Sequence, residues 1–310
     1  MNIKLRFTSL ALALMLGSGA AMAADLKIGV AMSQFDDTYL TYMREYMGKK
    51  AKAMGDVDLQ FVDGRNDVNR QLDQVQELIG KDVDALIVNP VDTEGTAKIT
   101  KAATAAGIPL VYVNRRPDDP KLPAGVASVT SDDKEAGRLQ MEYLAKKMDG
   151  KGTIVILLGE LSNNSTRGRT DGVKEVLKKY PNIKITQEQT GGWQREKGMA
   201  LTNDWLTQGT GFNAIISNND EMAIGAAMAL KSAGKKQGEV LVAGVDGTPD
   251  GLNAVKKGDL TVSVFQDAKG QGEGAIDAAV KMAKKQPLPE QAIVIPFRLI
   301  TADNVKTFEQ

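Results

Sequence analysis

Short runs of aliphatic residues alternate along the chain with amphipathic stretches of helical length. The first four runs lie at 26–32, 57–62, 85–88 and 109–113, and all but 57–62 are largely apolar at successive positions. Continuous apolar runs are typical of strands that are covered on both faces, as in a parallel sheet flanked by helices. The stretches between them have apolar residues at helical spacing and predict helices at 37–54, 68–79 and 93–106.

The same alternation begins again after residue 130. Helices are expected at 133–148, 169–179, 196–207 and 221–232. Strands are expected at 153–158, 183–189, 214–217 and 239–243. A weak internal echo relates the two halves, because the segment 84–89 resembles the segment 213–218. The repeated pattern predicts an α/β fold of two similar lobes, each built on a doubly wound parallel sheet.

The C-terminal stretch adds too few elements for a third domain. It predicts a strand at 260–266, a helix at 270–285 and a further strand at 292–301. These elements can return to the first lobe and complete its sheet, so that the chain crosses between the lobes several times. Two lobes joined by several short ordered segments behave as a hinge.

The first 23 residues have the pattern of a secretory signal peptide. Lys4 and Arg6 form a basic start, an apolar run follows at 10–16, and Ala21-Met22-Ala23 is a small-x-small cleavage site. The apolar run is too short to span a bilayer. We therefore expect that the mature protein is exported.

Composition excludes many kinds of chemistry before any motif is considered. The chain has 310 residues, with 39 basic and 39 acidic residues, and it contains neither histidine nor cysteine. Balanced charge argues against a broad nucleic-acid surface. Without histidine or cysteine there is no histidine-based triad, thiol nucleophile, Cys/His zinc site or disulfide. No cofactor, metal or catalytic residue is expected.

Polar residues follow most of the predicted strands. In an open parallel sheet, ligands bind beyond the carboxyl ends of the strands. The strand-end residues of the first half are Asp36, Asp37, Tyr39, Asn89, Asn114 and Arg115. Those of the second half are Asn163, Asn164, Arg167, Trp193, Asn218, Asn219, Asp220 and Asp246, with Gln266 at the crossover.

This mixture of side chains suits a polyol. A hydroxyl both donates and accepts, carboxylates accept from it, and arginine and asparagine can bridge two adjacent hydroxyls. Aromatic rings can cover the apolar face of a sugar ring. Each single Asp or Asn has a simpler explanation, since residues such as Asn219 and Asp220 before a helix are commonly caps. Their recurrence at strand ends in both halves favours a binding site.

At these positions the sequence resembles the periplasmic sugar-binding proteins of ABC importers, of the ribose-binding-protein type. The most specific blocks are Asn218-Asn219-Asp220-Glu221-Met222-Ala223-Ile224-Gly225 and Gly244-Val245-Asp246-Gly247-Thr248-Pro249-Asp250-Gly251. The resemblance covers essentially the whole mature chain. It implies two Rossmann-like lobes joined by a three-strand hinge, with the ligand clamped between them. The implied lobes are 24–131 with 267–297, and 132–266 with 298–310.

The resemblance also implies which residues bind the ligand. From the first lobe these are Asp37 and Tyr39, with Asn114 and Arg115 at the place of the family's Asp-Arg pair. The implied second-lobe and hinge residues are Arg167, Trp193, Asn219, Asp246 and Gln266. Asp36 is added because it forms a carboxylate pair with Asp37.

Three departures from the ribose type bear on the ligand. Asn114 replaces an aspartate, Leu40 replaces a second aromatic residue, and Asp36-Asp37 stands where the ribose type has asparagine. The segment 113–117 resembles the inositol-binding branch. A cyclitol with six hydroxyls offers more hydrogen-bond donors than a sugar with a ring oxygen, so its site needs more acceptors. We therefore expect myo-inositol or a close cyclitol, with ribose or another monosaccharide as the alternative.

Partners and rival functions follow from the same resemblance. It implies an importer permease in the inner membrane, a monomer, and no nucleic acid; a chemoreceptor is an alternative partner. An exported carbohydrate-active enzyme would need paired carboxylates such as Asp37 and Asp246, which nothing in the sequence demands. A transcription regulator of this fold would have a helix-turn-helix where this chain has its signal peptide.

Overall fold

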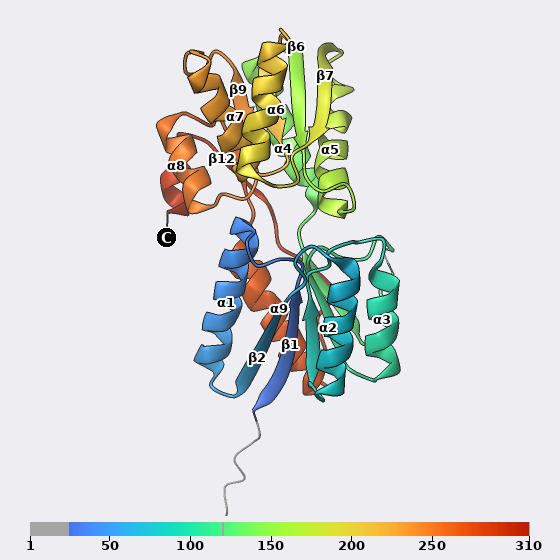
Figure 1. Ribbon diagram of the computed structural model, residues 1–310. Helices are drawn as coiled ribbons and strands as arrows, with labels where there is room; N and C mark the ends of the chain where they lie inside the picture. The colour runs from blue at the N-terminus through green and yellow to red at the C-terminus, as the bar shows by residue number, and fades with distance from the viewer. Residues whose placement is uncertain (1–24, 120, 310) are drawn as a thin grey trace, which may run out of the picture.

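The computed structural model describes residues 25–119 and 121–309, and it consists of two lobes stacked end to end (Figure 1). The expected signal peptide at 1–23 lies outside the described residues. Each lobe has its own parallel sheet with helices on both faces, so the predicted fold class is confirmed. Among the described residues, no helix is both long and apolar enough to cross a membrane.

The first lobe, below in Figure 1, contains a six-stranded parallel sheet in the order β11-β5-β4-β3-β1-β2. Its strands are β1 Leu26–Met32, β2 Val57–Asp63, β3 Ala85–Val88, β4 Leu110–Asn114, β5 Val126–Thr130 and β11 Ala292–Val294. Its helices are α1 Thr38–Met54, α2 Val68–Gly80, α3 Thr96–Ala105 and α9 Ala268–Ala283. Helices α1 and α9 bury one face of the sheet, and α2 and α3 bury the other.

The second lobe contains a four-stranded parallel sheet in the order β7-β6-β8-β9. Its strands are β6 Lys151–Leu158, β7 Asn182–Thr190, β8 Ala214–Ser217 and β9 Leu241–Ala243, with the antiparallel pair β10 Ser263–Phe265 and β12 Arg298–Ile300 alongside β9. Its helices are α4 Asp133–Lys147, α5 Asn164–Leu177, α6 Arg195–Thr207, α7 Asp220–Ser232, α8 Pro249–Lys257 and the 3₁₀ turn η1 Val305–Phe308. Helices α4 and α5 cover one face, and α6, α7 and α8 the other.

The chain passes between the lobes three times. It leaves the first sheet after β5, returns from β10 to α9, and crosses again from β11 to β12. The stretch 292–301 is therefore two short strands rather than the single strand that its apolar pattern predicts. It breaks at Pro296, which cannot donate to a sheet, and its two halves pair with different lobes.

Three further elements differ from the sequence prediction. Strand β5 was not expected, because its five residues have a short pattern of small and polar side chains. Helix α8 was also not expected, although Thr248 caps it and Pro249 occupies its first turn, which are recognised start signals. Helix α5 begins at Asn164, earlier than the predicted residue 169. This earlier start places the first turn of α5 at the interlobe cleft.

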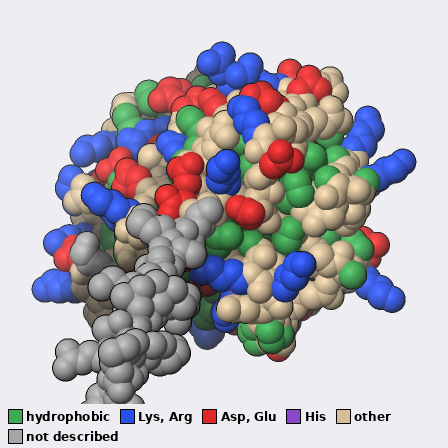
Figure 2. Space-filling view, turned by 90° about the horizontal axis from the view of Figure 1, so that it is seen from below, with side chains coloured by type: hydrophobic (Ala, Val, Ile, Leu, Met, Phe, Trp, Pro, Cys, Tyr) green, Lys and Arg blue, Asp and Glu red, His purple; other side chains and the backbone are tan. Residues whose placement is uncertain are grey.

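Charge is mixed on the one face of the molecule that is seen from below. Figure 2 shows basic and acidic side chains interspersed on the lower face of the first lobe, without a broad patch of one sign. This face therefore has no broad basic patch of the kind that binds nucleic acid.

Candidate functional site

A cavity lies where the two lobes meet, at the carboxyl ends of both sheets. The first lobe contributes Asp37, Tyr39, Leu40, Asn114 and Arg115 to its lining. The second lobe and the crossover contribute Ser165, Arg169, Trp193, Asn219, Asp246 and Gln266. The space between these side chains is about 20 Å³, which is less than a sugar ring needs. The polar groups of the two lobes therefore lie close together across this cavity.

Eight of the ten residues that the sequence analysis expects to bind the ligand line this cavity. Asp36 does not, because it is exposed while its neighbour Asp37 turns inward to cap α1. Arg167 does not, and Arg169 occupies the cavity instead.

The helical period explains the difference between Arg167 and Arg169. Ser165 and Arg169 are four residues apart and share one face of α5, and both line the cavity. Arg167 is two residues from each and lies on the opposite side of the helix. Its guanidinium contacts Glu94 at 3.3 Å and Asp118 at 2.6 Å, and both of these acids belong to the first lobe. The structure therefore corrects the expectation that Arg167 faces the ligand space.

Arg169 connects the polar groups of the second lobe. It is 3% exposed and donates to Asp133 Oδ1 at 3.0 Å, to the Asn218 carbonyl at 2.6 Å and to Gln266 Oε1 at 2.9 Å. Its Nη1 is 3.8 Å from Asp246 Oδ1. The guanidinium thus holds the crossover Gln266 and the carboxylate Asp246 in one buried network.

The first-lobe wall rests on a buried glutamine that the sequence analysis did not single out. Gln271, at the start of α9, accepts through Oε1 from the Tyr39 hydroxyl at 2.9 Å and from Asn114 Nδ2 at 3.3 Å. Its Nε2 donates to Ser131 Oγ at 2.9 Å, directly after β5. Gln271 therefore joins two cavity residues to a crossover segment. The sequence predicts a helix at 270–285 but gives no sign that Gln271 has this role.

Burial controls the ionisation of the cavity groups. Burial raises the pKa of Asp246 well above its usual range, and the charge of Arg169 opposes that rise. Burial also raises the pKa of Asp37, against the Leu40 amide and the charge of Arg115. The pKa of Arg115 is lowered to about 10 by burial, although Asp37 favours its charged form. Burial therefore disfavours the charged forms of these carboxyl and guanidinium groups, and a polar partner in the cavity would stabilise those forms.

Three cavity residues have left-handed backbone conformations that non-glycine residues rarely adopt. They are Asn114 at φ 64°, Trp193 at φ 70° and Asp246 at φ 128°. Backbone strain of this kind concentrates at functional sites, because the surrounding structure must maintain it. The Trp193 ring lies so close to Gly159 that a Cβ on that residue would be 2.1 Å from the ring. Trp193 is thus held in a specific orientation.

Trp193 and Asn219 meet in the lining of the cavity. Trp193 Nε1 is buried and has no hydrogen-bond partner among the described residues, although an indole N–H usually finds one. Asn219 caps α7 by accepting from the Met222 amide at 3.0 Å, and its Nδ2 donates to the Trp193 carbonyl at 3.1 Å. Asn219 is therefore both the expected helix cap and a cavity residue. Caps and binding groups coincide because helices begin at the strand ends.

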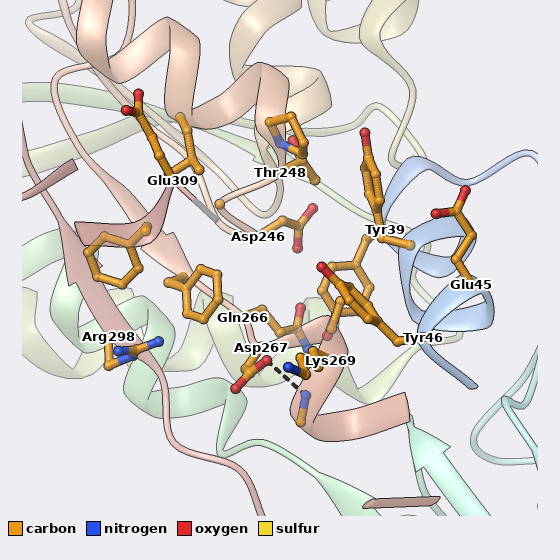
Figure 3. A pocket seen from close by; sticks show the side chains of 18 of the residues that line it. Tyr39, Glu45, Tyr46, Asp246, Thr248, Gln266, Asp267, Lys269, Arg298 and Glu309 are labelled. Atoms are coloured by element: carbon orange, nitrogen blue, oxygen red, sulfur yellow. Dashed lines mark hydrogen bonds between the residues drawn. The ribbon is translucent and has the colours of Figure 1, made fainter. Parts of the chain in front are cut away.

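A second and larger cavity of about 730 Å³ lies beside the first, between α1 and α8. Figure 3 shows Tyr39 and Tyr46 on one side of it and Thr248 and Glu309 on another, with Asp246 between them. The two cavities share Tyr39, Asp246 and Gln266, each at most 6% exposed. These three residues form the wall that separates the inner cavity from this outer groove.

No group of His, Cys, Asp and Glu side chains within 25–119 and 121–309 is arranged to hold a metal ion. The inner cavity instead combines carboxylates, amides, two guanidinium groups and an indole contributed by both lobes. Such a set can pair with several hydroxyls of one small ring at the same time.

Comparisons with known proteins identify the family of this chain. Residues 28–287 match the family model described as a periplasmic binding protein domain. A Rhizobium meliloti protein named "Putative rhizopine-binding protein" is 48% identical over 91% of this chain and 92% of its own length. A solute-binding protein from Bacillus halodurans, solved with bound myo-inositol, is 39% identical with a TM-score of 0.86 over 92% of this chain and 98% of that one. A solute-binding protein from Actinobacillus succinogenes, solved with D-allose, is 30% identical with a TM-score of 0.84 over 91% and 100%.

Proposed function

Since the chain belongs to the periplasmic binding protein domain family, we propose that it captures a cyclic polyol, myo-inositol or a close cyclitol, between its lobes. At the coarser level it is a periplasmic sugar-binding protein of the ABC transporter type, like its solute-binding relatives. The finer proposal concerns the ligand and the residues that hold it.

The observation that carries the proposal is the inner cavity, because its polar groups come from both lobes. A ligand favours closure only if it binds the closed state better than the open one. Asp37, Asn114 and Arg115 on one side and Arg169 and Asp246 on the other meet this requirement. We assign the binding role to these residues together with Tyr39, Trp193, Asn219 and Gln266.

Two features favour a cyclitol over an aldose. A cyclitol has a hydroxyl on every ring carbon and no ring oxygen, so it needs acceptors and donors all around the ring. Asn114 supplies an amide that does both, and the indole of Trp193 has an unused donor. The relative solved with myo-inositol supports this choice. The relative solved with D-allose supports the alternative, a monosaccharide such as ribose or allose.

The remaining parts of the proposal concern assembly and partners. We assign 24–131 with 267–297 to one lobe and 132–266 with 298–310 to the other, and we propose that the monomer presents its closed form to an importer permease. A chemoreceptor is the alternative reader of the same closed form. Co-purification from membranes distinguishes these two partners, and light scattering tests the monomer.

Isothermal titration calorimetry tests the ligand. The mature protein, unfolded and refolded to release any retained ligand, is titrated with myo-inositol and, in parallel, with ribose, D-allose, galactose and glucose. We expect one-to-one binding that is tightest for myo-inositol. Tight binding of ribose or allose with no response to myo-inositol would overturn the cyclitol assignment, and no response to any of the five would overturn the ligand class.

A further inference from the structure

The flank of the cleft between α3 and α5 is closed by direct hydrogen bonds between the lobes. Thr93 of the first lobe donates to the Ser162 carbonyl through its amide at 3.2 Å and through its hydroxyl at 3.1 Å. The same hydroxyl accepts from the Asn164 amide at 3.1 Å. Asn164 Nδ2 in turn donates to the Arg116 carbonyl at 2.9 Å. These bonds place the first turn of α5 against the two first-lobe loops that follow β3 and β4.

Arg167 adds an ionic layer outside these bonds. Its guanidinium contacts Asp118 Oδ2 at 2.6 Å and Glu94 Oε1 at 3.3 Å, and it donates to Thr93 Oγ1 at 3.3 Å. Within its own lobe it donates only to the Leu161 carbonyl, at 3.2 Å. We name the whole set the interlobe latch; it comprises Thr93, Glu94, Arg116 and Asp118 of the first lobe and Ser162, Asn164 and Arg167 of the second.

No residue of the interlobe latch lines the inner cavity. Its partners are 48 to 74 residues apart in the chain, so local sequence does not keep them together. The lobes are joined covalently only at the three crossings, which lie on other elements. The latch bonds therefore form only while the lobes are in contact.

We propose that the interlobe latch contributes to ligand affinity without touching the ligand, because it stabilises the closed arrangement that the ligand selects. The apparent dissociation constant equals the intrinsic one divided by the fraction of protein in the competent state. Bonds that exist only in the closed state raise this fraction. The inference rests on the proposed function in one respect, namely that the ligand is held between the lobes.

The latch has two parts that respond differently to salt. Thr93 is 1% exposed, and its hydroxyl is fully engaged, so its loss would leave the Ser162 carbonyl and the Asn164 amide underpaired. The side chains of Arg167, Glu94 and Asp118 are 36%, 70% and 46% exposed, so solvent and salt screen their attraction. The buried part should therefore have the larger effect, and the ionic part should account for any dependence on salt.

Two latch variants and one matched control test the proposal by calorimetry and stopped-flow kinetics. Thr93→Val keeps the side-chain shape and should weaken binding about tenfold, mainly through faster release. Arg167→Ala should weaken it about threefold and reduce the dependence of affinity on salt. Lys174→Ala removes another α5 cation, whose partner Glu188 lies in the same lobe at 2.9 Å, and should leave affinity unchanged.

A second measurement reports the latch without any ligand. Because the chain has no cysteine, a Lys52→Cys/Lys236→Cys pair places one dye on each lobe, and energy transfer then reports lobe separation. In the ligand-free protein, Thr93→Val should shift the distribution toward the open form, whereas Lys174→Ala should not.

The two measurements separate this inference from the proposed function. Wild-type affinity in Thr93→Val and Arg167→Ala, together with an unchanged ligand-free distribution, would overturn the latch. If the wild type binds no polyol, the proposed function fails and the ligand-free distribution decides the latch alone. Identical distributions in wild type and Thr93→Val would then overturn it.

Discussion

The two flanks of the interlobe cleft are closed in different ways. On the α3–α5 flank, to the right in Figure 1, the lobes touch through the interlobe latch. On the α1–α8 flank, to the left, they are separated by the outer groove of about 730 Å³. The floor of the groove includes Arg298, whose guanidinium lies 4.8 Å from the ring centre of Phe265 and 4.9 Å from that of Phe308.

The ion pairs show why the flanks differ. On the latch flank, Arg167 pairs with acids of the opposite lobe. On the groove flank, Lys256 pairs with Glu309 at 2.9 Å within the second lobe, and Lys49 pairs with Glu45 within α1. Charges that are satisfied within one lobe give no preference for closure. Changes on the latch flank should therefore alter affinity through closure, and equivalent changes on the groove flank should not.

The largest effect should come from the wall between the flanks, where Asp246 faces the inner cavity. Asp246→Ala should weaken binding by about 100-fold or more, since it removes an acceptor and leaves Arg169 with one partner fewer. The ligand-free melting temperature should not fall, because burial already raises the pKa of this carboxyl and makes its charge costly. Calorimetry and thermal melts check both expectations.

Asp250→Ala is the matched control for this variant. Asp250 is an exposed acid of the same loop and helix, and it pairs with Arg195 at 2.7 Å outside the cavity. Its removal should leave affinity unchanged. Near-wild-type affinity in Asp246→Ala with an unchanged melting curve would remove Asp246 from the site.

Gln271→Met should have the next largest effect, about a tenfold loss of affinity. The variant keeps the side-chain length but leaves the Tyr39 hydroxyl and Asn114 Nδ2 without their shared acceptor. It also separates them from Ser131 at the crossover. Titration calorimetry checks the loss, and Glu273→Gln on the groove side of the same helix should bind normally; equal losses in both variants would contradict the assignment.

Tyr46→Ala tests the groove flank directly. Tyr46 lines the outer groove and not the inner cavity, and no hydrogen bond joins it to the second lobe among the described residues. We expect less than a twofold change in affinity, compared with about tenfold for Thr93→Val on the latch flank. A loss as large as that of Thr93→Val would show that both flanks contribute to closure, and the contrast between them would disappear.

The smallest expected effect is a pH dependence of stability that comes from Asp220, whose partner Gly247 lines the outer groove. Asp220 accepts from the Gly247 amide at 2.8 Å and from Ser263 Oγ at 2.6 Å, and burial raises its pKa to about 7. Its folded-state pKa lies above its ordinary value of 3.8, so its contribution to stability is fully present below pH 3.8 and is lost as pH rises through about 7. The melting temperature should fall less between pH 5 and pH 8 in Asp220→Asn than in wild type. Equal slopes in thermal melts would contradict this.

Much of the fold could be predicted because periodic apolar runs determine strands and helices locally. Strand β1 and helix α1 were predicted within a residue of their observed bounds. Strand β5 could not be found in the same way, since its five residues become a strand through pairing with β4 and β11. The break at 295–297 arises because β11 pairs with the first lobe and β12 with the second. The apolar pattern is the same in both strands, so it does not predict the break.

The candidate site was predictable where a strand end fixes the position of a side chain. Asn114 is the last residue of β4 and Asp246 follows β9 by three residues, and both line the cavity. Arg167 and Arg169 differ only in helical phase, which depends on where α5 begins. Gln271 is 157 residues from Asn114, so no local pattern connects them.

Local sequence patterns are enough to predict the two α/β lobes, the returning C-terminal stretch and a polar set at the strand ends, because these follow from periodicity and from the geometry of parallel sheets. Sequence patterns do not show which arginine lines the cavity, which glutamine supports it, or which flank carries the interlobe latch. These depend on contacts between segments far apart in the chain, whose partners are chosen by the packing of whole lobes rather than by neighbouring residues.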